Sequence, residues 1–181
     1  MSSLNQKTNI FAYLDGANLH KGVQELGWHL DYARFRTWLK DKYKVSQVYL
    51  FIGLIPKYKT LYAFLQEAGY ILVFKETTYD NNGKAKGNCD ADLVLKVVCD
   101  FYENKINKAV LVTGDGDFAG LAQFLLKKGA LRVVIAPDNR KCSILLKRTN
   151  APITYLKELE TILAINEKAP NKDKTLPGSF S

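Results

Sequence analysis

The stretch KAVLVTGDGDFAGLAQFLLKKGALRVVIA, residues 108–136, decides the fold class of this chain. It contains an apolar run of strand length at 108–112, a helical segment at 118–128 that Gly129 ends, and a second apolar run at 132–136. Two strands joined by a helix in this way run parallel, because the crossover carries the chain back to the same end of the sheet. The stretch therefore predicts a parallel sheet covered by helices.

Strands and helices alternate along the rest of the chain as well. Apolar, β-branched or aromatic runs predict further strands at residues 9–14, 47–55, 70–74 and 153–156. Helical spacing of apolar residues predicts helices after the capping residue Asp31, at 58–68, at 90–101, around 141–147 and up to about 165. We expect a Gly-containing loop between the first strand and Asp31. An exposed hairpin or loop is expected at 76–87, where Asn82-Gly83 favours a turn.

Residues 47–55, QVYLFIGLI, form an almost unbroken apolar run of the kind that is buried on both faces of a parallel sheet. This run predicts a central strand. We therefore expect one domain over residues 1–165, a three-layer α/β/α sandwich with a mainly parallel central sheet. Residues 166–181 are rich in Pro, Lys, Gly and Ser, which predicts a disordered tail.

The composition, with 47% hydrophobic and 24% charged residues, is that of a globular protein. No apolar run reaches the roughly 20 residues of a membrane span. The first nine residues, MSSLNQKTN, lack the charged start and apolar stretch of a secretory signal. Three scattered cysteines, Cys89, Cys99 and Cys142, form no paired-thiol metal motif, and we expect free thiols. These features predict a cytoplasmic protein that does not enter a membrane.

The formal net charge of the chain is +8, while its scarce acidic residues recur just after apolar runs. A positive exterior attracts polyanions, so nucleic acid is the first partner to consider. Many basic proteins bind nothing anionic, however, and charge by itself is equally compatible with plain solubility. The sequence is also compatible with a homodimer and does not decide the oligomeric state.

Three carboxylates follow two of the predicted strands. Asp15 comes directly after strand 9–14, and Asp115 and Asp117 come directly after strand 108–112. Parallel strands end at the same edge of a sheet, where α/β proteins bind their ligands. Carboxylates held close together repel one another, and a bound Mg²⁺ or Mn²⁺ removes that cost. We expect a metal site here, although Gly-Asp-Gly-Asp is also ordinary turn chemistry.

Asp90 and Asp92 begin the helix predicted at 90–101 and could bring another carboxylate to this edge. They point about 200° apart on a helix, so we expect at most one of them to bind the metal directly, and we favour Asp90. Helix capping explains Asp90 equally well, because an acidic residue at a helix N-terminus stabilises the helix dipole.

Three other residues near these carboxylates have candidate roles. Asn18 could hydrogen-bond the phosphate or Asp15, or serve as a local turn amide, and Thr113 could add a hydroxyl outside the metal's ligands or simply end its strand. Lys86 is the basic residue nearest to Asp90 in the sequence and could contact phosphate. The two histidines, His20 and His29, lie apart in the expected early loop and show no zinc spacing.

Three motifs resemble the signatures of the NYN (LabA-like) branch of PIN-like nucleases: YLDGANL at 13–19, KGNCDADLVL at 86–95 and VTGDGDFAGL at 112–121. The resemblance runs from about residue 9 to residue 165. It implies a PIN-like α/β/α sandwich with an acidic pocket for Mg²⁺ or Mn²⁺ and activity on RNA. By position, the acidic set corresponds to Asp15, Asp90, Asp115 and Asp117, and Asn18 corresponds to the family's recurring Asn.

The chain departs from the family pattern at Lys96, where many relatives carry a further Asp in the middle helix. Asp92 is an acid at a nearby position, so the sequence leaves open which carboxylate completes the site. With that exception, the motifs predict a metal-dependent ribonuclease that hydrolyses single-stranded RNA without a side-chain nucleophile.

Three other functions are alternatives to a ribonuclease. A PIN-like domain can bind RNA without cutting it, so a non-catalytic RNA-binding or regulatory module remains the alternative. A phosphatase of the haloacid dehalogenase type also places an Asp after its first strand, but it needs a second Asp two residues later, where Ala17 stands. A dinucleotide-binding domain is excluded because no Gly-rich phosphate turn follows the first strand.

Overall fold

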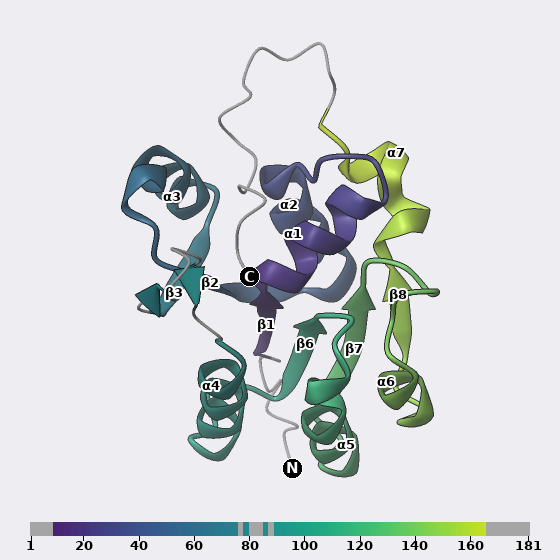
Figure 1. Cartoon of the computed structure of the whole chain (residues 1–181). Coiled ribbons are helices and arrows are strands. Elements are labelled where there is room, and N and C mark those ends of the chain that lie inside the picture. Colours follow the sequence, from purple (N-terminus) through teal and green to yellow (C-terminus); the bar gives the residue numbers. More distant parts are fainter. Residues whose placement is uncertain (1–8, 76–77, 80–84, 87–88, 166–181) are drawn as a thin grey trace.

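The computed structural model describes residues 9–75, 78–79, 85–86 and 89–165. Its main sheet has six strands in the order β3-β2-β1-β6-β7-β8, and all neighbouring strands are parallel (Figure 1). Their bounds are β1 Ile10–Asp15, β2 Val45–Gly53, β3 Tyr70–Lys75, β6 Lys108–Val112, β7 Leu131–Ala136 and β8 Ile153–Tyr155. The parallel sheet predicted from the sequence is confirmed.

Helices cover both faces of this sheet (Figure 1). One face carries α1 (Gly16–Glu25), α2 (Tyr32–Tyr43), α3 (Lys59–Glu67) and α7 (Glu160–Leu163). The other carries α4 (Asp90–Tyr102), α5 (Ala119–Lys127) and α6 (Ile144–Arg148). Two hydrophobic cores result because successive side chains of a strand point to opposite faces: Leu14 packs into the first core and Tyr13 into the second. The fold is the expected three-layer α/β/α sandwich.

The strand order reverses between β1 and β6. From β1 the chain builds β2 and β3 on one side, then passes through α4 and builds β6, β7 and β8 on the other. Such a switch point leaves a crevice at the carboxyl ends of the two middle strands. Asp15 ends β1, and the Thr113–Asp117 loop follows β6. The fold thus brings the predicted acidic residues to one place.

The segment after β1 is a helix, α1, so the prediction of a loop there is wrong. Asp15 caps this helix by accepting a hydrogen bond from the backbone N–H of Asn18 at 3.1 Å. The glycines that suggested a loop allow close packing instead. A Cβ on Gly22 would lie 2.2 Å from Cγ of Pro137, and one on Gly16 would lie 2.4 Å from Cγ2 of Ile52.

Several element bounds differ from expectation. The strand expected at 47–55 spans Val45–Gly53 and lies second from the edge of the sheet, with β1 and β6 at its middle. The helix expected near 141–147 begins at Ile144, because the Ser143 hydroxyl accepts from the N–H of Leu145 and caps it there. In the expected hairpin, β4 (Thr78–Tyr79) pairs antiparallel with β5 (Ala85–Lys86).

No helix in the described part of the chain is long and apolar enough to cross a membrane. The three cysteines are free, as expected from their spacing. The tail predicted at 166–181 lies outside the described residues.

Candidate metal centre

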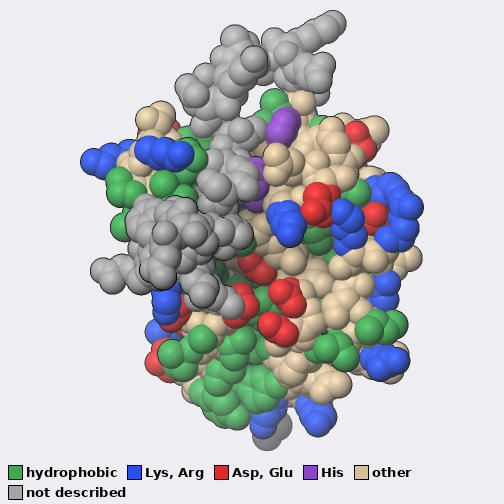
Figure 2. Space-filling view, viewed as in Figure 1, with side chains coloured by type: hydrophobic (Ala, Val, Ile, Leu, Met, Phe, Trp, Pro, Cys, Tyr) green, Lys and Arg blue, Asp and Glu red, His purple; other side chains and the backbone are tan. Residues whose placement is uncertain are grey.

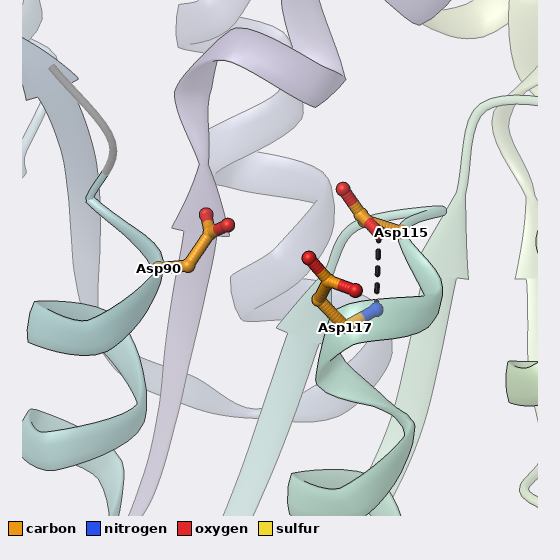
Figure 3. A group of neighbouring side chains, drawn as sticks. All are labelled: Asp90, Asp115 and Asp117. Carbon is orange, nitrogen blue, oxygen red and sulfur yellow. Dashed lines mark hydrogen bonds between the residues drawn. The ribbon is translucent and has the colours of Figure 1, made fainter.

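Three carboxylates meet at the switch point. One oxygen each from Asp90, Asp115 and Asp117 lies within 4.8 Å of the other two. In Figure 3, Asp90 extends from the start of α4 toward the loop that carries Asp115 and Asp117. Two oxygens bound to one Mg²⁺ or Ca²⁺ at 2.0–2.6 Å lie about 3 to 5 Å apart. The spacing and the oxygen-only ligand set therefore fit a hard divalent cation.

The loop after β6 is held in shape by its own hydrogen bonds. Oδ1 of Asp115 accepts from the backbone N–H of Asp117 at 3.0 Å, the bond drawn in Figure 3. The loop then enters a short 3₁₀ turn, η2 (Gly116–Phe118), which leads into α5. Gly116 lies against α6's cap, since a Cβ there would be 2.4 Å from Oγ of Ser143. These contacts fix the two loop carboxylates relative to each other.

Asp15 lies beside the three grouped carboxylates. Its Oδ1 accepts from the N–H of Asn18, and its Oδ2 accepts from the Thr113 hydroxyl at 3.2 Å. Burial, and then the charges of Asp90 and Asp115, raise the pKa of Asp15 to about 6, although both hydrogen bonds act in the opposite direction. A bound cation would relieve this unfavourable charge.

Asn18 and Thr113 tie the start of α1 to the loop after β6. Oδ1 of Asn18 accepts from the N–H of Gly114 at 2.8 Å, and Oγ1 of Thr113 accepts from the N–H of Asp115 at 3.1 Å. The Asn18 side-chain oxygen is thus used within the protein, in a bond to a residue 96 positions away that the sequence did not indicate. Thr113 is 2% exposed and contacts both Asp15 and Asp115.

A family model for the NYN domain matches residues 9–155. The chain belongs to the NYN domain family, a family of PIN-like nucleases. No curated protein matches it. A crystal structure of a protein of unknown function from Vibrio parahaemolyticus RIMD 2210633 is similar in fold, with 21% identity and a TM-score of 0.70, over 97% of this chain and 100% of that chain.

Asp92 and Lys96 form ion pairs outside the group of three carboxylates. Asp92, the alternative to Asp90, accepts from Nζ of Lys75 at 2.8 Å and is outside the group of three. Lys96 donates to Asp100 at 2.6 Å and 2.7 Å, on the middle of α4. Lys86 is placed on β5 by its backbone, and its side chain is outside the described part of the structure.

Cys89 directly precedes α4 and was not predicted to be near the metal centre. Burial, and then the charges of Asp92, Asp15 and Asp90, raise the pKa of its thiol to about 11. The thiol therefore stays protonated at neutral pH, which makes it a poor nucleophile and a poor metal ligand.

The two histidines of this NYN domain are neighbours, although the sequence placed them apart in a loop. His20 is on α1, and both His20 and His29 line a small cavity with Trp28 and Tyr32. Burial, and then His29, lower the pKa of His20 to about 4. Among the described residues, Nε2 of His20, Nε1 of Trp28 and the Tyr32 hydroxyl are buried without a hydrogen-bond partner.

Acidic side chains gather in the middle of one face of the molecule, and Lys and Arg side chains are spread around them (Figure 2). With a net charge of +8, this NYN domain thus has an acidic centre within a basic protein. Clustered carboxylates give the centre a negative potential, opposite in sign to the net charge of the chain.

Proposed function

We propose that this NYN domain is a divalent-metal-dependent ribonuclease that hydrolyses phosphodiester bonds of single-stranded RNA. The proposal rests above all on the approach of Asp90, Asp115 and Asp117 to within 4.8 Å of one another. Membership of the NYN domain family supports nuclease activity in general. Oxygen ligands without His or Cys support Mg²⁺ or Mn²⁺ as the ion.

In this mechanism, Asp90, Asp115 and Asp117 hold the ion and Asp15 adds a fourth negative charge beside them. When bound, such an ion polarises a phosphate oxygen and lowers the pKa of a water ligand, which makes hydroxide available for in-line attack. Thr113 and Asn18 keep Asp15 and the Asp115 loop together through the hydrogen bonds described above. The protein supplies no covalent nucleophile.

RNA as the substrate is supported by the family and by the basic surface. Asp90 and Asp115 are half-buried, which favours a flexible single strand over a rigid duplex. Lys86 is a proposed phosphate contact. The cytoplasm is the proposed location of the reaction.

The decisive experiment incubates labelled single-stranded RNA with Mg²⁺, Mn²⁺ or EDTA, using wild type, Asp15→Asn and Asp117→Asn. The matched control is Asp41→Asn, which neutralises an exposed carboxylate on α2. We expect cleavage with metal by wild type and by the control, and none with EDTA or by Asp117→Asn.

Cleavage by Asp15→Asn or by Asp117→Asn at the wild-type rate would overturn this mechanism. If RNA binding is salt-sensitive, survives EDTA and gives no product with any metal, the domain is a non-catalytic RNA-binding module instead.

A further inference from the structure

A buried charged group lies on α4, two to three turns beyond Asp90. Asp100 is only 1% exposed, and its carboxylate accepts hydrogen bonds from two side chains. The Tyr13 hydroxyl donates to Oδ2 at 2.8 Å, and Nζ of Lys96 donates to Oδ1 at 2.6 Å and to Oδ2 at 2.7 Å. We call Tyr13, Lys96 and Asp100 the α4 anchor.

The α4 anchor joins the helix to the middle of the sheet. Tyr13 is on β1, two residues before Asp15, and its ring stacks on Tyr49 of β2 with 5.5 Å between centroids. Nζ of Lys96 lies 4.5 Å from the centroid of the same Tyr49 ring. The helix is thereby fixed to the strand that carries Asp15 and to its neighbour.

Stability does not explain why this group is charged. The Asp100 side chain is buried, and that of Lys96 is 31% exposed. Replacing a largely buried ion pair by well-packed apolar residues is often neutral or stabilising, because the charges no longer have to leave water. Leu93 and Val97 already pack α4 into the second core. What directed hydrogen bonds add to such apolar packing is a defined position and rotation of the helix.

Rotation of α4 matters at its start, where Asp90 lies. The helix radius including side chains is about 5 to 6 Å, so a rotation of about 30° moves a side chain by about 3 Å. That movement is a large part of the 4.8 Å within which the oxygens of the three carboxylates lie.

We infer that Tyr13, Lys96 and Asp100 are positioning residues: they fix α4 against β1 so that Asp90 stays within reach of the metal held by Asp115 and Asp117. This inference rests on the proposed function, since it assumes that the three carboxylates bind a divalent ion. It assigns a purpose to Lys96, the position at which this chain departs from the family pattern.

The test replaces the whole anchor with apolar residues, in the triple variant Tyr13→Phe, Lys96→Met and Asp100→Leu. Mn²⁺ affinity is measured by calorimetry, thermal stability by circular dichroism, and RNA hydrolysis at several Mn²⁺ concentrations. We expect stability equal to or above wild type, an Mn²⁺ affinity about 10-fold to 100-fold weaker, and hydrolysis that is partly restored by excess Mn²⁺. A merely structural role would leave the affinity unchanged in a folded variant.

The matched control is the double variant Glu103→Gln and Lys105→Gln, which removes an exposed ion pair just beyond α4 and the 4.0 Å approach of Lys105 to Asp100. It should bind Mn²⁺ like wild type. Tyr13→Phe alone, which keeps the Lys96 and Asp100 pair, should weaken Mn²⁺ binding less than the triple variant. If the triple variant does not fold, unchanged affinity in Tyr13→Phe overturns the inference.

The two hypotheses fail in different ways. Absence of Mn²⁺ binding in wild type, or undiminished binding in Asp117→Asn, overturns the proposed function. If wild type binds Mn²⁺, Asp117→Asn does not, and the folded triple variant binds with wild-type affinity, then the positioning role alone is wrong.

Discussion

The carboxylate of Asp15 and the hydroxyl of Thr113 meet across the two middle strands of the sheet, with 3.2 Å between Oδ2 and Oγ1. The same Thr113 oxygen accepts from the N–H of Asp115. One buried hydroxyl therefore connects the carboxylate at the end of β1 with the loop that carries the other two acids after β6. This connection can be removed without changing any charge.

Thr113→Val should weaken both the fold and the metal site. It leaves the partly buried N–H of Asp115 without its acceptor and Asp15 without one donor, which costs about 1 to 3 kcal/mol of unfolding free energy. Mn²⁺ affinity should fall as well, because the Asp115 loop is no longer tied to Asp15. Urea denaturation and calorimetric titration measure the two effects. Thr113→Ser keeps the hydroxyl and should behave like wild type; equal losses in both variants would contradict this role.

The sequence located this site because parallel strands end at a shared edge. Asp15 and the Asp115 loop could be placed together from the pattern of strands alone, and the start of α4 added Asp90. The hydrogen bond between Asn18 and Gly114 could not be predicted, because it joins segments 96 residues apart whose contact depends on how α1 packs. The α1 helix was missed because Gly16 and Gly22 suggest a loop, while their lack of a side chain permits tight packing.

Asp90 rather than Asp92 should bind the metal. Asp90 belongs to the group of three carboxylates, whereas Asp92 forms an ion pair with Lys75 at the end of β3. Periodicity placed these residues on different sides of the helix but could not say which side faced the loop. We expect Asp90→Asn to abolish measurable Mn²⁺ binding and Asp92→Asn to reduce affinity only modestly, through its longer-range charge. A larger loss in Asp92→Asn than in Asp90→Asn would reverse the assignment.

Metal affinity should increase as the pH rises through about 6. Burial raises the pKa of Asp15 to about 6, so below that pH a proton competes with the cation for the site. Titrations with Mn²⁺ between pH 5 and pH 7.5 should show this increase, and Asp15→Asn should flatten it. If the pH dependence is equally steep in Asp15→Asn, the proton that competes with the cation is bound by another group.

In the metal-free protein, the contribution of Asp15 to stability should decrease as the pH rises, whereas metal affinity increases. The pKa of Asp15 in the folded protein, about 6, lies above its ordinary value of 3.8, so the folded state binds more protons between these two pH values. The contribution of Asp15 to stability is therefore present at low pH and is lost as the pH rises from about 3.8 to about 6. In EDTA at pH 7, Asp15→Asn should unfold at a higher urea concentration than wild type. A lower urea midpoint for Asp15→Asn would show that the charge of Asp15 does not destabilise the apo-protein.

His20 should stay neutral well below the pH at which an ordinary histidine is charged. Burial, and then His29, lower its pKa from 6.5 to about 4, so the unfolded chain binds more protons in that range. His20 therefore destabilises the fold progressively as the pH falls from about 6.5 to about 4. NMR titration of the two imidazoles should give one resonance that shifts with a midpoint near 4, and His20→Gln should remove that resonance and reduce the acid sensitivity. A midpoint near 6.5 for His20 would mean that water reaches the cavity and that His20 is not desolvated.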